Sequence, residues 1–290
     1  MGQKDLREKV LEDYEDVFSD IFNGLLFEDN VINQRFLKPS STESVYKAED
    51  GVYREQRRGV LKEYMSECLL EIGSLGIENQ SSVDNYISVR IMGYDYTKYH
   101  SQVKRKTYPI LPVITIVLNF SDKPWNKMQS LFSIMSIPKE FETFVQDYKV
   151  KVFDIAFLED HVIERFTSDF KIVARFFKNK RLGLINLFGN DKICHVQAFL
   201  DLLAVFTSDN RYKDIKQELT QIEKEGRTVT MCNVAQALED IGIKKGIEKG
   251  KLIQLVELAK TGDLPIEKAS QKAGMTVDVF KERMLDLCKS

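Results

Sequence analysis

A carboxylate and a side-chain amide stand two residues apart in the segment Gly76-Ile77-Glu78-Asn79-Gln80, at the end of a strand-like stretch. Side chains alternate across a strand, so Glu78 and Gln80 share one face. A magnesium-dependent nuclease presents a metal ligand beside a water-handling group in this way, because Mg²⁺ prefers oxygen ligands and needs only one or two carboxylates besides water and phosphate. A solvated strand edge gives the same pattern, so the spacing alone leaves both interpretations open.

The elements around this pair are predicted by hydrophobic periodicity. The pair ends the second of two candidate strands, Gly59–Met65 and Leu69–Asn79, which we expect to pair with each other. The next segment, Val83–Val103, predicts a helix, with Ser81 and Ser82 as its caps. We therefore expect the strand end and this helix to position any chemistry.

The rest of the chain predicts an α/β fold. Leu111–Phe120 is almost continuously apolar, which is typical of a central strand covered on both faces, and Lys149–Ala156 predicts a further short strand. Residues 4–27 predict an amphipathic helix, and residues 28–56 are polar, with a loop marked by Pro39, Ser40, Ser41 and Thr42. The pattern turns helical from about residue 158. The predicted class is a mixed sheet flanked by helices, with a largely helical C-terminal half.

Composition excludes several classes of protein. The 290 residues carry a formal net charge of -2, which excludes a globally basic nucleic-acid binder but leaves room for a local basic groove. No apolar run approaches the roughly 18 residues of a membrane span, and the charged N-terminal stretch does not read as a signal peptide, so we expect a cytoplasmic protein without a membrane partner. The 4 cysteines show no CxxC pairing and the 3 histidines are scattered, which favours free thiols over a zinc site.

Several segments match a known family in order along the chain: FSDIFNGLLF, YREQRRGVLK, GIENQSSVDNYISVRIMGYDYTKY, LPVITIVLNF, VQDYKVKVFDI, FTSDFKIVARFF and TMCNVAQALEDIGIKKGIEKG. On these segments the chain resembles the recombination-promoting nuclease and putative transposase family, a branch of the PD-(D/E)XK phosphodiesterases. The resemblance implies a restriction-endonuclease-like domain with a helical extension over residues 1–227 and a helical tail over residues 228–290. It also implies Mg²⁺-dependent DNA cleavage, with Mn²⁺ as an alternative ion.

The resemblance also implies roles for individual residues. Glu78 matches the family's metal-binding Glu, and Gln80 stands where the wider superfamily has Lys; an amide can orient water or phosphate but cannot act as a base. Arg90, Tyr94 and Tyr99 match the following helix, where an Arg could face a phosphate of bound DNA. The alternative is that these three side chains line a polar helix face and pack the sheet.

Further candidates lie on the first helix and in basic clusters. Asp20 matches an acidic position that could join the metal site through water, and the alternative is an ordinary surface Asp. Basic residues that could contact a DNA backbone, or could be simply solvated, precede and follow the site. They are Arg54, Arg57, Arg58, Lys62, Lys98, Lys104, Arg105 and Lys106.

The departure from the family is Gly59, which stands where the resemblance implies a metal-ligand Asp. Glycine has no ligand atom, so Glu78 would bind a dication much more weakly alone. Because adjacent strands run roughly 4.8 Å apart, we expect Gly59 close to Glu78, with room for an Asp side chain. Two functions remain open: a Mg²⁺-dependent DNA endonuclease whose site is degenerate, or a non-catalytic DNA-binding or oligomerising protein on a nuclease-derived scaffold.

The C-terminal tail has a pattern of its own. Gly242, Gly246 and Gly250 repeat every four residues in a Lys- and Glu-rich segment, which fits either a solvated linker helix or a self-association seam. Two short helices, Ile266–Ala273 and Val277–Leu287, superficially resemble a helix-turn-helix but lack an obvious basic recognition face. We therefore expect them to mediate dimerisation or docking, and the protein to form homo-oligomers.

Overall fold

The computed structural model describes residues 10–27, 29–41, 43–47, 53–57, 59–126, 129–184 and 190–286. The chain divides into two compact units, Met1–Met231 and Cys232–Ser290. All strands of the described residues belong to the first unit. The candidate chemistry of Glu78 therefore also belongs to the first unit.

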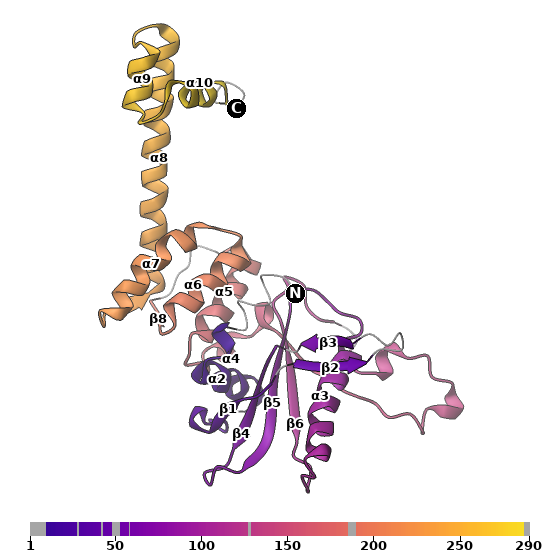
Figure 1. Ribbon diagram of the computed structural model, residues 1–290. Coiled ribbons are helices and arrows are strands. Elements are labelled where there is room, and N and C mark those ends of the chain that lie inside the picture. The colour runs from indigo at the N-terminus through magenta and orange to yellow at the C-terminus, as the bar shows by residue number, and fades with distance from the viewer. Residues whose placement is uncertain are drawn as a thin grey trace. The chain divides into compact units, whose positions relative to one another are not determined.

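A five-stranded mixed sheet lies in the first unit, in the order β1-β4-β5-β6-β7 (Figure 1). Its strands are β1 (Leu37–Pro39), β4 (Val60–Met65), β5 (Glu71–Gln80), β6 (Val113–Asn119) and β7 (Lys151–Asp154). β4 runs antiparallel to β1 and β5, whereas β6 runs parallel to β5 and β7. The predicted pairing of the two strands before the helix is confirmed. The apolar strand β6 is an interior strand, and the α/β class is confirmed.

Helix α3 (Ile87–Lys104) covers one face of this sheet. Its apolar side packs against β6 in a cluster formed by Ile87, Ile91, Tyr94, Val117, Trp125 and Val150. The helix starts later than predicted, and Ser81 and Ser82 do not cap it. The reason is local: the Asp84 carboxylate accepts the Tyr86 N–H at 2.8 Å, which forms a turn before the first helical residue.

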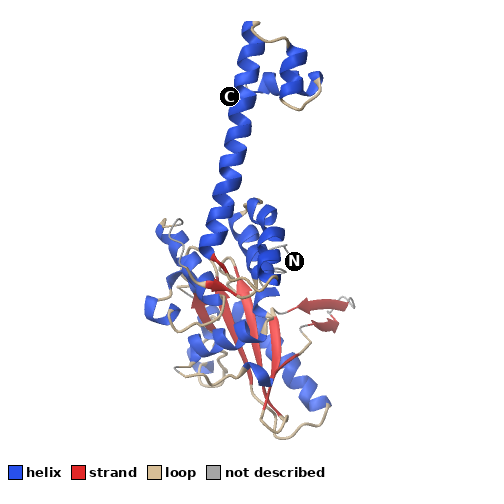
Figure 2. Ribbon diagram, turned by 90° about the vertical axis from the view of Figure 1, so that its left-hand side faces the viewer, coloured by secondary structure: helices blue, strands red, loops and turns tan. Residues whose placement is uncertain are grey.

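Helix α2 (Glu15–Leu26) lies on the opposite face, and Figure 2 shows helices on both sides of the strands. Alternation along the strands explains the division. Asn79 points away from Glu78 and donates its side-chain N–H to Glu12, just before α2, at 2.8 Å. Apolar side chains of α2 are fully buried, including Phe18 and Phe22. The predicted first helix is thus confirmed from residue 10 onward, with a break before Glu15; residues 1–9 are outside the described part.

Sequence analysis predicted no strand in the polar segment 28–56, but strands lie there. It contains β1, whose Leu37 pairs with Tyr64 of β4. It also contributes the strands β2 (Glu43–Lys47) and β3 (Tyr53–Arg57), which pair as an antiparallel ribbon. Strand pairing supplies the backbone hydrogen bonds here, and a polar sequence carries no periodic signal for it.

The second half of the first unit is helical, as predicted. Its helices are α4 (Asp160–Ile163), α5 (Phe170–Leu182), α6 (Val196–Thr207) and α7 (Arg211–Lys224). A short ribbon of β8 (Lys192–Ile193) and β9 (Val229–Thr230) accompanies them. Aromatic packing joins these helices to the sheet, because the rings of Phe120, Phe177 and Phe206 contact one another with centroids 4.5 to 5.5 Å apart.

The C-terminal unit consists of helices, as predicted. These are α8 (Met231–Thr261), whose first residue closes the preceding unit, α9 (Ile266–Lys272) and α10 (Val277–Asp286). Gly242, Gly246 and Gly250 lie within continuous α8, and a Cβ added at any of them would meet nothing within 4 Å. These glycines therefore serve no close packing within the described chain. No helix among the described residues combines the length and apolar character that a membrane span requires.

Candidate nucleic-acid site

Glu78 lies near the end of β5, and the residue is 7% exposed. Its Oε2 accepts the backbone N–H of Gly59 at 2.9 Å, and its Oε1 accepts a side-chain N–H of Gln80 at 3.3 Å. The predicted common face of Glu78 and Gln80 is therefore confirmed. The predicted proximity of Gly59 to Glu78 is confirmed as well, because β4 and β5 pair next to them.

The expected room for an Asp at position 59 is not there. A Cβ built on Gly59 would lie 2.2 Å from the carbonyl oxygen of Ile77 and 3.3 Å from the Cα of Glu78. Backbone atoms cannot turn away as a flexible side chain can, so an Asp here requires the two strands to separate locally. Glycine allows the close approach by which its amide reaches the Glu78 carboxylate.

Arg90 reaches the same carboxylate from α3. Its Nη2 lies 3.8 Å from Oε1 of Glu78 and 3.1 Å from Oδ2 of Asp84. Both contacts are ion pairs without hydrogen-bond alignment, and the buried Nε and Nη2 of Arg90 have no hydrogen-bond acceptor among the described residues. Because buried donors without acceptors are costly, these two nitrogens favour an anionic ligand. Sequence analysis missed Asp84, although it stands in the segment between the two Ser candidates and Arg90.

The two tyrosines have packing environments. Tyr94 is 4% exposed and belongs to the apolar cluster beneath α3. The hydroxyl of Tyr99 accepts the N–H of Val113 at 3.1 Å, at the start of β6. Between them, the carboxylate of Asp95 accepts hydrogen bonds from the hydroxyls of Thr115 and Tyr148. The packing alternative fits Tyr94 and Tyr99, which hold the helix that carries Arg90.

Asp20 is a buried residue of α2, and both of its carboxylate oxygens accept hydrogen bonds. It is 7% exposed, so it is not an ordinary surface residue. Its two oxygens accept the backbone N–H and the hydroxyl of both Thr167 and Ser168, at 2.6 to 3.0 Å. These donors come from the turn before α5, so Asp20 fixes that turn. A carboxylate engaged in this way does not fit the metal ligand expected from the resemblance.

Two of the predicted basic contacts are buried ion pairs. Lys62 is 0% exposed and donates to the backbone carbonyl oxygen of Asp13 at 2.6 Å and to its carboxylate at 3.0 Å. Lys98 is 8% exposed and donates to the carboxylate of Glu63 at 2.6 Å. The prediction that these two lysines contact DNA is wrong, because neither cation faces solvent.

The other basic candidates differ in placement. Arg58 lies outside the described residues, and the side chains of Arg54 and Arg57 do too. The cluster at the end of α3, formed by Lys104, Arg105 and Lys106, is exposed. These cations are at the opposite end of α3 from Arg90, and Nη2 of Arg105 lies 3.9 Å from a carboxylate oxygen of Glu71.

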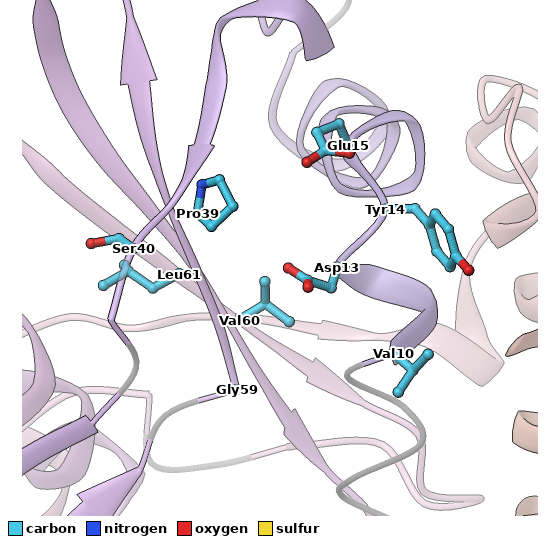
Figure 3. Close-up of a pocket in the computed structure, with 9 residues that line it drawn as sticks. All are labelled: Val10, Asp13, Tyr14, Glu15, Pro39, Ser40, Gly59, Val60 and Leu61. Atoms are coloured by element: carbon cyan, nitrogen blue, oxygen red, sulfur yellow. The ribbon is translucent and has the colours of Figure 1, made fainter.

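A cleft of about 670 Å³ adjoins Gly59 between the start of α2 and the edge of the sheet (Figure 3). Its lining residues are Val10, Asp13, Tyr14, Glu15, Pro39, Ser40, Gly59, Val60 and Leu61. The charged side chains among them are the carboxylates of Asp13 and Glu15, which repel phosphate. Glu78 and Arg90 do not line this cleft. We therefore place the nucleic-acid candidate on the Arg90 face instead.

The donor set at Glu78 does not make a magnesium site by itself. Among the residues that the structure describes, no three or more His, Cys, Asp or Glu side chains group around a possible ion position. Both Glu78 oxygens already accept N–H donors, and a guanidinium stands 3.8 Å away. One such carboxylate neither neutralises a dication nor fixes its geometry.

Residues 74–197 match the model of a protein family described as a putative transposase, YhgA-like. The matched segment contains Glu78, Gln80, Asp84 and Arg90, together with α3 and the parallel strands. The resemblance to a putative transposase family is therefore confirmed over this segment, and the mixed sheet is consistent with the PD-(D/E)XK type. No curated protein and no solved structure matches the chain significantly.

Proposed function

We propose that this chain, whose residues 74–197 match the model of the YhgA-like putative transposase family, binds DNA through the Arg90 face of its sheet and cleaves it little. The observation that carries the proposal is the Arg90 guanidinium, whose buried Nε and Nη2 have no hydrogen-bond acceptor among the described residues. Two oxygens of one phosphate match the fork of N–H groups on a guanidinium, and this pairing is strong because both partners are charged.

The surroundings of Arg90 support phosphodiester recognition. Gln80 stands beside Glu78 and offers an amide that could hydrogen-bond to a phosphate or to water. Helix α3 is held rigidly by the Asp95 network, so Arg90 is supported by a fixed element. Weak cleavage follows from Gly59, which provides an amide donor where the family resemblance implies a second carboxylate.

A second candidate function is metal-dependent DNA cleavage, and one observation favours it. Asp84 and Glu78 both lie within ion-pair distance of the same Arg90 nitrogen. If a DNA phosphate drew Arg90 away, two carboxylates that share one cation could share Mg²⁺ or Mn²⁺ instead. Glu78 and Asp84 would then hold the ion, with the phosphate and water supplying the remaining oxygens.

DNA binding is tested by fluorescence anisotropy with a labelled duplex over a range of salt concentrations. Arg90→Ala is expected to weaken binding about tenfold and to reduce the salt slope by about 1, because one phosphate contact is lost. The matched control is Arg165→Ala, which removes an exposed Arg outside the site. Unchanged binding by Arg90→Ala, or an equal loss in both variants, would overturn the proposed site.

Cleavage is tested by plasmid nicking with Mg²⁺ or Mn²⁺. We expect little nicking by the unmodified chain, and Gly59→Ala separates the steric effect of a Cβ from the ligand effect of Gly59→Asp. More nicking by the Asp variant than by the Ala variant would support the second carboxylate. Robust nicking by the unmodified chain that is lost in Asp84→Asn would establish the second candidate function and refute weak cleavage.

Self-association through the C-terminal helices is also a proposal. Ile243 and Ile247 stand one turn apart on α8 and are 53% and 52% exposed. The open space beside the three glycines would let another helix approach this side of α8 closely. Truncation after residue 235 should then reduce the number of chains per particle in sedimentation; a full-length chain that is already a monomer, or an unchanged number of chains, would contradict the idea.

A further inference from the structure

The C-terminal unit contains a groove of about 560 Å³ between α8 and the α9–α10 pair. The groove is formed within one unit, and none of its residues belongs to the DNA-binding candidate. Its lining residues are Lys245, Glu248, Lys249, Lys251, Leu252, Leu255, Lys272, Ala273, Met275 and Arg283. Apolar side chains form one part of this set and cations form the other.

The apolar part is a half-buried floor, formed by Leu252, Leu255, Ala273 and Met275. These side chains pack on the small core of the unit, which consists of Val256, Ala269 and Phe280. The floor is therefore supported from below, and its outer surface lines the groove. A Met among the floor residues can adapt to different apolar side chains, because its thioether chain is flexible.

The charged side chains of the groove are mostly positive. Five cations line the groove, Lys245, Lys249, Lys251, Lys272 and Arg283, against the single carboxylate of Glu248. Within the described part of the chain, no carboxylate forms an ion pair with Lys249, Lys251, Lys272 or Arg283. The chain as a whole carries a formal net charge of -2, so this local excess of cations is a feature of the groove.

We propose that this groove docks an acidic amphipathic helix of another protein. The supported apolar floor would receive the apolar side of that helix, and the cations would face its Glu and Asp residues. DNA is the competing ligand, but phosphate contacts would leave the apolar floor without a counterpart.

The probe is a labelled peptide of about 20 residues, with Leu at positions i, i+3, i+4 and i+7 and Glu on the flanks. Anisotropy with the full chain should show saturable binding. Binding should weaken at least tenfold when the Glu residues of the peptide are replaced by Gln, and when Lys249→Glu and Arg283→Glu are combined in the protein. Both substituted residues are exposed, so folding should be preserved, and circular dichroism checks it.

The matched control is Lys281→Glu, which reverses an exposed cation of α10 outside the groove and should leave binding unchanged. Equal losses in the control and the double variant, or no binding of the acidic peptide, overturn the proposal. Loss of duplex DNA binding in the double variant, without peptide binding, would instead make the groove a nucleic-acid surface. A dimer that the double variant dissociates, again without peptide binding, would assign the groove to a second copy of this chain.

Discussion

Glu78 and Asp20 are both buried carboxylates, and sequence analysis assigned both to one metal site, yet their surroundings differ. Asp20 is surrounded by donors from a single turn, Thr167 and Ser168, which use both of its oxygens. Glu78 accepts the backbone N–H of Gly59 and a side-chain N–H of Gln80, and it stands beside Arg90, whose buried donors lack acceptors among the described residues. The first arrangement is complete within the described residues, whereas in the second the two buried nitrogens of Arg90 leave hydrogen-bonding capacity for a ligand.

This difference separates a buried carboxylate that stabilises the fold from a buried carboxylate that lies at a ligand site. Burial does not distinguish them, because both residues are 7% exposed. Completeness of hydrogen bonding does, since a native fold rarely leaves buried donors without acceptors unless something else supplies them. If the comparison is sound, changes at Asp20 should alter stability and changes at Glu78 should alter binding.

The largest expected effect is from Asp20→Ala. It leaves the buried donors of Thr167 and Ser168 without acceptors, so the free energy of unfolding should fall by about 3 kcal/mol or more. Urea unfolding measures the loss. The control is Asp29→Ala, which removes the carboxylate of an exposed aspartate. DNA affinity per folded molecule should not change. A loss of DNA affinity with intact stability would break the comparison and return Asp20 to the site.

The next effect is steric, at Gly59→Ala. The new Cβ would meet the carbonyl oxygen of Ile77 at 2.2 Å, so the strands must separate at a cost of about 1–3 kcal/mol. The same shift should weaken the hydrogen bond from the backbone N–H of residue 59 to the Glu78 carboxylate. Faster hydrogen exchange of this amide would report the change. Gly242→Ala is the control, because a Cβ there meets nothing within 4 Å and helix propensity alone should stabilise it. Equal stability of both variants would show that the close approach at Gly59 is relaxed in solution.

Glu78→Gln should have a smaller effect and mainly on binding. Gln keeps an acceptor for the Gly59 N–H while removing the negative charge 3.8 Å from Arg90. We expect DNA affinity to rise about threefold, and the free energy of unfolding to change by less than about 1 kcal/mol. The anisotropy assay gives the first quantity and urea unfolding the second. Weaker binding by this variant would mean that the carboxylate itself serves the ligand, as the metal-dependent alternative requires.

Much of the frame around Glu78 could be predicted from the sequence, because burial leaves a periodic signal. The β-branched run in Leu111–Phe120 indicated an interior strand, and the period of two placed Glu78 and Gln80 on one face. The start of α3 could not be predicted from its serines, since a single side-chain bond from Asp84 set a turn there. The ribbon of β2 and β3 was missed because pairing between polar strands has no apolar pattern.

The site itself was less predictable than the frame. Lys62 is a cation in a run of basic residues, and nothing in that run indicates that the side chain is fully buried against Asp13. The clash at Gly59 depends on where the Ile77 carbonyl points, which is a property of backbone geometry and not of residue types. The sequence does not indicate that Asp84 lies beside Arg90, because their ion pair forms only in the folded chain.

The smallest expected effect concerns pH and a second complete cluster, in which His195 joins α2 to the start of α6. Its Nε2 lies 3.0 Å from both oxygens of Asp16, and its ring stacks on Tyr14. Burial lowers the pKa of His195, but the hydrogen bond to Asp16 and the charges of Asp16, Asp169 and Glu223 raise it, so the net pKa lies above its ordinary 6.5. Burial raises the pKa of Asp16, and its bond to His195 with the cation's charge lowers it below 3.8 overall.

The two shifts fix the direction of the pH dependence. A raised histidine pKa stabilises the fold fully below about pH 6.5 and loses that contribution as pH rises through the folded value. A lowered carboxyl pKa stabilises it above about pH 3.8 and loses that contribution as pH falls further. Between about pH 6 and 9 the free energy of unfolding should therefore fall, by only about 0.5–1 kcal/mol because the pair is partly exposed.

His195→Gln should flatten this slope while Arg90→Ala leaves it unchanged, since Arg90 belongs to the incomplete site. A slope that persists in His195→Gln would assign the pH dependence to other groups and remove this cluster from the comparison.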